Sequence, residues 1–232
     1  MKEIKTIVIA VAVSVIASAC ILAFGLSTVA RPDRTVTVRG LAEKEVDADI
    51  AVWPLSFTLG GNDLAVLQKN VMTAVDSVKA YLAEYGLDGS DYTVQAPSIT
   101  DNSVNPYIDR NADRYTYLAK NVILVRSSKV DKVKAAHADS LKLMGDGIAV
   151  SQDYDSKISY EFTGLNEIKP AMIAEATQNA RLAAEQFARD SGSKVGKIKR
   201  ATQGLFSIDN LAVGLEEKKN VRVVTTVEYL IK

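Results

Sequence analysis

The feature that most constrains this chain is a run of 24 uncharged residues, residues 7–30, close to its N-terminus. A short basic start with Lys2 and Lys5 precedes it. As a helix the run is about 36 Å long, enough to cross a hydrocarbon core of about 30 Å. A secretory signal has a shorter apolar region, of about 7 to 15 residues. The length therefore predicts an uncleaved signal anchor that contacts membrane lipid through residues 7–30, with residues 1–34 as anchor and short linker.

Two alternatives to an uncleaved anchor remain open. Ala17-Ser18-Ala19 precedes Cys20 as small residues precede a lipidated cysteine, although the apolar run continues beyond it. Thr28-Val29-Ala30 has the small-x-small form of a cleavage site, which would release a soluble chain beginning at Arg31. Cys20 is thus a lipidation candidate, and cleavage after Ala30 is the other alternative.

Orientation is not determined by charge, because Arg31 and Arg34 follow the run about as closely as Lys2 and Lys5 precede it. The segment nevertheless begins like a signal peptide. We therefore expect a single span with the C-terminal domain exported.

Small side chains recur every four residues within the run, at Ala10, Ser14 and Ser18. This spacing places them on one face of a helix, where close backbone approach favours association of membrane helices. Such a strip also arises by chance in signal segments rich in alanine and serine. The strip is our candidate for helix packing in a homo-oligomer.

The remaining composition excludes several kinds of chemistry. With 28 basic and 28 acidic residues the chain is balanced, which argues against binding nucleic acid. One cysteine, Cys20, and one histidine, His137, are too few for a zinc site or a disulfide. His137 falls on the apolar stripe of an expected helix, which favours a half-buried structural histidine. We predict no catalytic, cofactor-binding or metal-binding residue.

Two local patterns come closest to ligand sites, and both have simpler interpretations. Residues 60–63, Gly-Gly-Asn-Asp, are more typical of a turn from strand to helix than of a phosphate loop. Asp101, Asp109 and Asp113 gather in one expected hairpin, but their spacing fits no calcium loop and arginines neutralise them. A solvated turn is the preferred interpretation.

Hydropathy patterns predict the first elements after the linker. Residues 35–38 and 50–59 are expected strands, and Pro54 within the second requires a sheet edge or a bulge, since proline donates no backbone hydrogen bond. Trp53 is expected in the core or at an edge. An amphipathic helix should follow from an N-cap at Asn62 to Gly86. Its apolar stripe is Leu64, Leu67, Val71, Val75, Val78, Leu82 and Tyr85.

The rest of the chain predicts a hairpin over residues 92–125, a helix over 130–144, a strand within 150–162 and a helix from Asn166. The last helix has an inner face rich in alanine, so it should lie flat on a sheet; the face is Met172, Ile173, Ala176, Ala180, Ala183 and Phe187. Two more strands, within 197–210 and 221–231, flank a charged stretch at 216–219 that is interpreted as a solvated loop. The predicted class is α+β: a largely antiparallel sheet packed with about three helices, preceded by one membrane-spanning helix.

Three segments of the chain resemble the SIMPL-domain family of bacterial envelope proteins. Residues 36–49 contain the pattern V-x-G-x-A-E-x-E-V-x-A-D, residues 176–188 an A-R-x-A-A-E helix, and residues 191–198 the pattern G-x-x-V-G. The resemblance covers residues 35–232, which we take as one SIMPL-like domain. It implies a periplasmic or membrane-associated protein, of the oxidative-stress-defence and periplasmic immunogenic type, with no assigned catalytic residues and with ring-forming relatives.

Together these observations predict a membrane-anchored, self-assembling envelope protein that contributes to oxidative or envelope stress tolerance and is not an enzyme. Its expected location is the bacterial inner membrane, with the domain in the periplasm or outside. One alternative is a small-molecule or peptide binding protein, which needs a pocket with convergent polar groups. Another is an atypical hydrolase, which needs two carboxyl groups whose pKa values are pushed apart.

Overall fold

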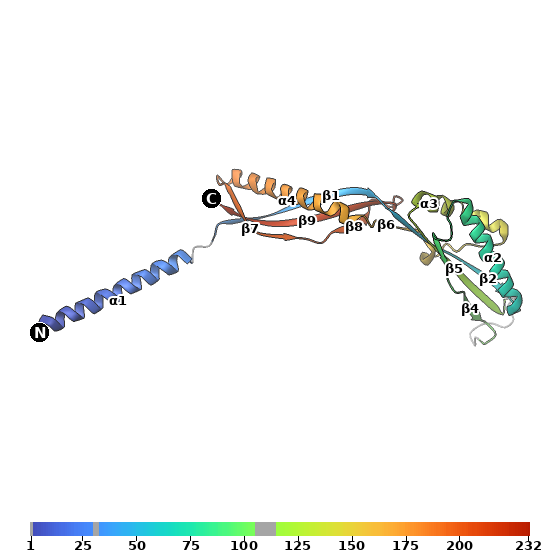
Figure 1. The fold of residues 1–232 in the computed structure, drawn as a ribbon, viewed down its shortest axis with the longest axis horizontal. Coiled ribbons are helices and arrows are strands. Elements are labelled where there is room, and N and C mark those ends of the chain that lie inside the picture. The colour runs from blue at the N-terminus through green and yellow to red at the C-terminus, as the bar shows by residue number, and fades with distance from the viewer. Residues whose placement is uncertain (1, 30–32, 105–114) are drawn as a thin grey trace. The chain divides into compact units, whose positions relative to one another are not determined.

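The computed structural model describes residues 2–29, 33–104 and 115–232 (Figure 1). The chain divides into two compact units. We call residues 1–40, 176–204 and 225–232 the terminal unit, and residues 41–175 and 205–224 the central unit. The prediction that residues 35–232 form one domain stays a prediction.

Helix α1 (Lys2–Val29) contains residues 7–29 of the uncharged run, and its side chains are described for residues 12–25. Among the residues that the structure describes, no helix is both long enough and apolar enough to cross a membrane. Cys20 is exposed on this helix. Of the cleavage site expected at residues 28–30, Ala30 lies outside the described residues, as does Arg31.

A four-stranded sheet has the order β1 (Thr35–Asp47), β9 (Lys218–Ile231) and β7 (Val195–Gln203), and β8 (Ser207–Asn210) also pairs with β9. β7 and β8 both run antiparallel to β9. In the terminal unit, Val36, Val227 and Tyr229 from this sheet pack against the alanines of helix α4 (Leu165–Asp190). Figure 1 shows α4 lying along the sheet.

The flat packing expected of the alanine-rich helix is confirmed. At Gly40 in β1, a Cβ atom would lie 1.8 Å from the carbonyl oxygen of Ala176 and 2.4 Å from the nitrogen of Ala180. The expected inner face was wrong at its end, because Ala183 and Phe187 are exposed. The buried positions instead recur every four residues, which places them on the same face of the helix. They are Met172, Ala176, Ala180, Ala184 and Ala188.

The central unit contains a second antiparallel sheet of five strands, with the order β3 (Tyr92–Val94), β5 (Tyr117–Ser127), β2 (Ile50–Gly61), β6 (Ser159–Glu161). β4 (Ser98–Asp101) also pairs with β5. Its helices are α2 (Leu64–Glu84), α3 (Val130–Ala138) and the 3₁₀ segments η1 (Ser140–Asp146) and η2 (Tyr154–Ser156).

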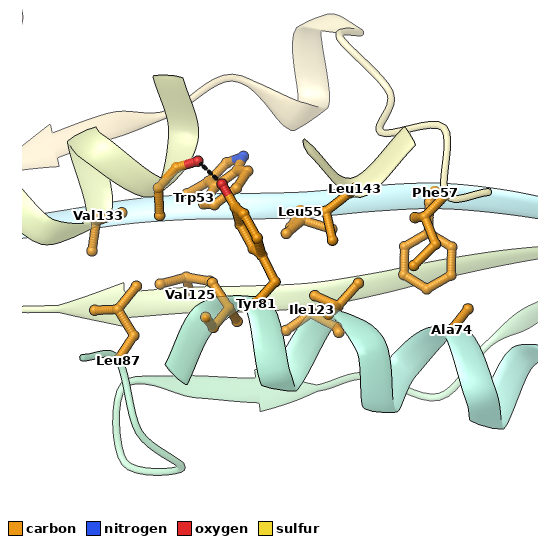
Figure 2. Packing of buried hydrophobic residues seen from close by; sticks show 14 of the residues in the cluster. Trp53, Leu55, Phe57, Ala74, Tyr81, Leu87, Ile123, Val125, Val133 and Leu143 are labelled. Atoms are coloured by element: carbon orange, nitrogen blue, oxygen red, sulfur yellow. Dashed lines mark hydrogen bonds between the residues drawn. The ribbon is translucent and has the colours of Figure 1, made fainter. Parts of the chain in front are cut away.

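Figure 2 shows the core between this sheet and its helices. Alternate residues of β2, namely Trp53, Leu55 and Phe57, are at most 1% exposed, as the period of a strand with one buried face requires. The Tyr81 hydroxyl on α2 donates to the carbonyl oxygen of Ala136 on α3, which joins the two helices. The core placement expected for Trp53 is confirmed.

Pro54 lies at a local gap in strand pairing rather than at a bulge. The register of β2 with β5 is unbroken from Ala51 to Gly61 and pairs Pro54 with Leu124. On the other side of β2, strand β6 reaches only residues 50–52. Pro54 therefore lies where β2 has β5 on one side and, on the other, a short unpaired gap between β6 and the bridge that joins Phe57 to Val150.

Two helix boundaries differ from expectation. The N-cap of α2 is Asp63, whose side chain accepts from the Val66 nitrogen at 2.9 Å, while Asn62 accepts from Thr116. The helix expected over residues 130–144 ends at Ala138 and continues as η1. A 3₁₀ turn has three residues, so the stripe loses its common face: Leu143 is buried, whereas Leu141 and Met144 are exposed.

The mixed α+β class with antiparallel pairing is confirmed, but the single sheet is wrong, because β1 and β2 begin two separate sheets. The stretch at 216–219 is also more than a solvated loop. Glu217 pairs with Lys134, and Lys219 is buried with its ammonium donating to Asn210 at 2.5 Å. Strand β9 begins at Lys218, so Lys219 belongs to the sheet and not to a loop.

Candidate functional site

One hollow in the central unit is an apolar groove of about 550 Å³ between α2 and the strand edge formed by β3 and β4. Most of its walls are aliphatic side chains. We call it the α2–β4 groove. Its lining residues are Leu64, Leu67, Gln68, Val71, Met72, Val75, Asp76, Lys79, Val94, Gln95, Pro97, Ile99 and Asn121.

The helical wall of the groove exists because the apolar stripe of α2 is longer than the surface that covers it. Towards the C-terminal end of α2, Val78 and Leu82 are fully buried against the sheet. Towards its start, Leu64 is 51% exposed and Met72 61% exposed. Leu67 is still buried there. The first half of α2 is therefore only partly covered, and Leu64 and Met72 leave apolar surface open to solvent.

The opposite wall is a single edge strand interrupted by a bulge. β3 pairs with residues 123–125 of β5, and β4 pairs with residues 117–120. Between these ladders Gln95 still donates to the Val122 oxygen at 3.0 Å. The register then shifts by one residue across Ala96 and Pro97, which makes this a β-bulge. No other described strand pairs with β3 or β4.

The polar groups of the groove are few. Its ionisable side chains, Asp76 and Lys79, pair with each other at 3.0 Å. The buried amide of Asn121 donates to the Ala119 carbonyl oxygen at 3.0 Å. The groove therefore offers apolar contact and no uncompensated charge.

A second hollow of about 670 Å³ adjoins the N-terminus of α3 and is lined by charged side chains. Four of these charges form two ion pairs: Lys134 with Glu217, and Lys218 with Asp47 at 2.8 Å. Lys134 lowers the pKa of Glu217, and Asp47 raises the pKa of Lys218. The hollow is a cleft of ion pairs.

The most buried carboxylate of the central unit is Asp91. It accepts from Lys129 at 2.7 Å, from the Ser127 hydroxyl at 2.6 Å and from the Asp88 nitrogen at 2.9 Å. Burial raises the pKa of this carboxyl, but the bonds from Lys129 and Ser127 outweigh it and hold the pKa below its usual value. This network ties the loop after α2 to the start of α3 and has a structural role.

A second polar cluster lies on the surface. The Tyr85 hydroxyl donates to Asp139 at 2.7 Å, and Lys142 donates to both groups. The bonds to Tyr85 and Asp139 raise the pKa of Lys142, and the bond from Tyr85 lowers the pKa of Asp139. Among the described carboxyl groups, each resolved pKa shift is downward.

His137 behaves as a structural side chain. It is half-buried on α3, with its ring 5.2 Å from that of Trp53 in an edge-on arrangement. Burial lowers its pKa below the usual value. No group of three or more metal-ligating side chains gathers in the parts of the chain that the structure describes.

The structure relates some of the residues selected from the sequence. Ser18 and Ser14 are joined on α1, where the Ser18 hydroxyl donates to the Ser14 carbonyl oxygen at 2.7 Å, whereas the side chain of Ala10 lies outside those described. Asp101 accepts from Ser103, while Asp109 and Asp113 lie outside the described residues.

The sequence did not predict the groove, because the apolar stripe that includes Leu64, Val71 and Val75 does not indicate which of its residues another element covers. The sequence contains one signal of the groove. Met72 widens the apolar stripe of α2, and Pro97 interrupts the strand segment that lies on the other side of the groove.

The fold and the two hollows describe an α+β protein with an apolar groove and several ion pairs. The family model of SIMPL, described as a protein of unknown function (DUF541), matches residues 36–227. The chain belongs to the SIMPL family, as the three sequence segments indicated. A comparison with curated individual proteins gives no match.

Proposed function

We propose that this chain is a membrane-anchored, self-assembling SIMPL-domain protein of the bacterial envelope that contributes to oxidative or envelope stress tolerance without catalysing a reaction. Its place is the inner membrane, with the residues after the anchor on the periplasmic side. The observation that carries the proposal is the uncharged run of residues 7–30, of which residues 7–29 belong to one continuous helix, Lys2–Val29.

Alkaline carbonate extraction of native membranes tests the anchor. The full-length chain should stay in the membrane pellet. A mature chain in the soluble fraction that begins at Arg31 would contradict the anchor. Incorporation of labelled palmitate that disappears in Cys20→Ala would replace it with a lipid anchor.

Self-assembly is supported by the resemblance to ring-forming relatives and by the strip at Ala10, Ser14 and Ser18. The mass of the native particle in lipid nanodiscs tests it. A particle of one chain would contradict assembly. If Ser14→Ile combined with Ser18→Ile reduces a multimer to one chain, the membrane helix drives assembly; an unchanged multimer assigns the contacts to residues 31–232.

A second candidate function is binding of an apolar ligand, and the α2–β4 groove favours it. Its volume of about 550 Å³ lies in the range of small-molecule sites, about 300 to 1,000 Å³. Titration with Nile red, an uncharged apolar dye, tests this candidate. Saturable dye fluorescence that is lost in Met72→Asp supports it, and absence of saturable binding contradicts it.

A further inference from the structure

The α2–β4 groove combines an apolar helix surface with an open strand edge, and the two together select one class of ligand. We infer that the groove binds an extended, uncharged apolar peptide segment, which adds to the sheet as a further strand beside β3 and β4. This inference rests on the second candidate function and is independent of the anchor and of self-assembly.

The first argument is the direction of the backbone groups of β4. Asn102 donates to the Thr116 carbonyl oxygen at 2.8 Å, in register with the β4–β5 ladder. In an antiparallel pair the bonded residues alternate, so Thr100 and Ser98 also direct their backbone groups at β5. The N–H and C=O groups of Ile99 therefore point to the open edge.

The same reasoning applies to β3. Gln95 donates to Val122 and Arg126 donates to the Asp91 oxygen, which fixes the alternation of this ladder. Val94 lies between bonded positions and directs its backbone groups outward. The side chains of Val94 and Ile99 line the groove. At these two positions the edge offers hydrogen bonds and apolar contact side by side.

The second argument is the spacing of the helical wall. Alternate side chains of an extended strand are about 6.8 Å apart. Side chains four residues apart on a helix, such as Val71 and Val75, are separated by about 6 Å along its axis. A strand added at the edge would thus place successive inward side chains against successive turns of α2, as in strand addition beside a helix.

The third argument is charge. Because Asp76 and Lys79 compensate each other, a charged side chain entering the groove would lose hydration without gaining a partner. The partner is therefore uncharged over the two or three residues it inserts. A free lipid tail or small apolar molecule would fill the groove but would leave the backbone groups of the edge without partners.

Fluorescence anisotropy with a labelled hexapeptide of alternating valine and threonine tests the inference on the full-length chain in lipid nanodiscs, where no free detergent competes. We expect saturable binding in the micromolar range. The matched control is the same peptide with its valine nitrogens methylated, which keeps the side chains but removes backbone donors. It should bind at least tenfold more weakly.

Protein variants locate the site. Met72→Asp places a charge in the groove and should weaken peptide binding at least tenfold. Val66→Asp is the matched control, because Val66 lies on the same helix, is 57% exposed against 61% for Met72, and does not line the groove. It should change binding less than twofold.

Three results would overturn the inference. Equal binding of the methylated peptide would show that the edge takes no part. If Nile red binds and the peptide does not, the groove remains a small-molecule site and the peptide inference is wrong. If neither binds, the second candidate function is wrong as well. Dissociation of a native multimer by Met72→Asp, with no peptide binding to the wild type, would assign the groove to another copy of the chain.

Discussion

Gly40→Ala should separate α4 from β1. The added Cβ would meet backbone atoms, the Ala176 oxygen at 1.8 Å and the Ala180 nitrogen at 2.4 Å. Neither atom can rotate away, so the helix or the strand must move by more than an ångström. Neighbouring contacts then open, and a gap of about 0.5–1 Å already loses about a quarter to a half of the dispersion energy of each contact.

The magnitude follows from this displacement. Adding one methyl group to a packed core costs about 1–3 kcal/mol when side chains can adjust, and more when they cannot. We expect the free energy of unfolding to fall by about 4 kcal/mol, because the obstacle at Gly40 is backbone. For a chain of this size that corresponds to a decrease of about 10 °C in Tm.

Thermal unfolding followed by circular dichroism measures the decrease, with hydrogen exchange of the α4 amides as a local readout. Gly89→Ala is the matched control, since no atom lies within 4 Å of the Cβ position there. It should alter stability by about 0.5 kcal/mol or less. If Gly40→Ala and Gly89→Ala have the same Tm and α4 amides exchange equally slowly in both, the close approach of helix and strand is refuted.

Three further predictions concern the central unit. Trp53→Ala removes a side chain that is 1% exposed and should lower the free energy of unfolding by about 4 kcal/mol in urea denaturation. Asp91→Asn should destabilise the fold most near neutral pH, because the pKa of Asp91 is lower in the folded chain than in the unfolded chain. The contribution of this carboxylate to the free energy of unfolding is fully present above the unfolded pKa of about 3.9. It is lost as the pH falls through the folded pKa. A stability gap to wild type that persists unchanged below that pKa would contradict the reasoning. Because burial lowers the pKa of His137, its ring signals in an NMR titration should shift at a pH below about 6.5. Acidification should favour the unfolded chain, in which this histidine protonates more readily. A titration midpoint above about 6.5 would contradict the burial.

Local patterns predicted much of the fold because they report local physics. Alternation along residues 50–59 predicted a strand with one buried face. Pro54 predicted either an edge or a bulge, and the register excludes the bulge and leaves Pro54 in an unpaired gap on one side of β2. The alanine-rich stripe predicted a helix lying flat on a sheet, because small side chains permit close approach. Its phase could not be chosen between Ala183 and Ala184, since both positions are alanine and only the surface of β1 selects one of them.

The candidate groove shows the limit of such patterns. The stripe of α2 reports that Leu64 and Val71 are apolar, but not whether another element covers them. Cover depends on where β3 and β4 pair with β5 and on the register shift across Pro97. These are contacts between segments distant in sequence, and an isolated helical pattern contains no information about them.

The sequence by itself determined the uncharged N-terminal run, the α+β class with antiparallel strands, and membership in the SIMPL family, because each depends on residues that are neighbours in the chain. Tertiary structure alone decided the division into two sheets, the pairing of Asp91 with Lys129 across 38 positions, and the groove beside α2. The physical reason is that burial and electrostatic pairing depend on which surfaces meet, and many arrangements of the same elements satisfy the local patterns equally well.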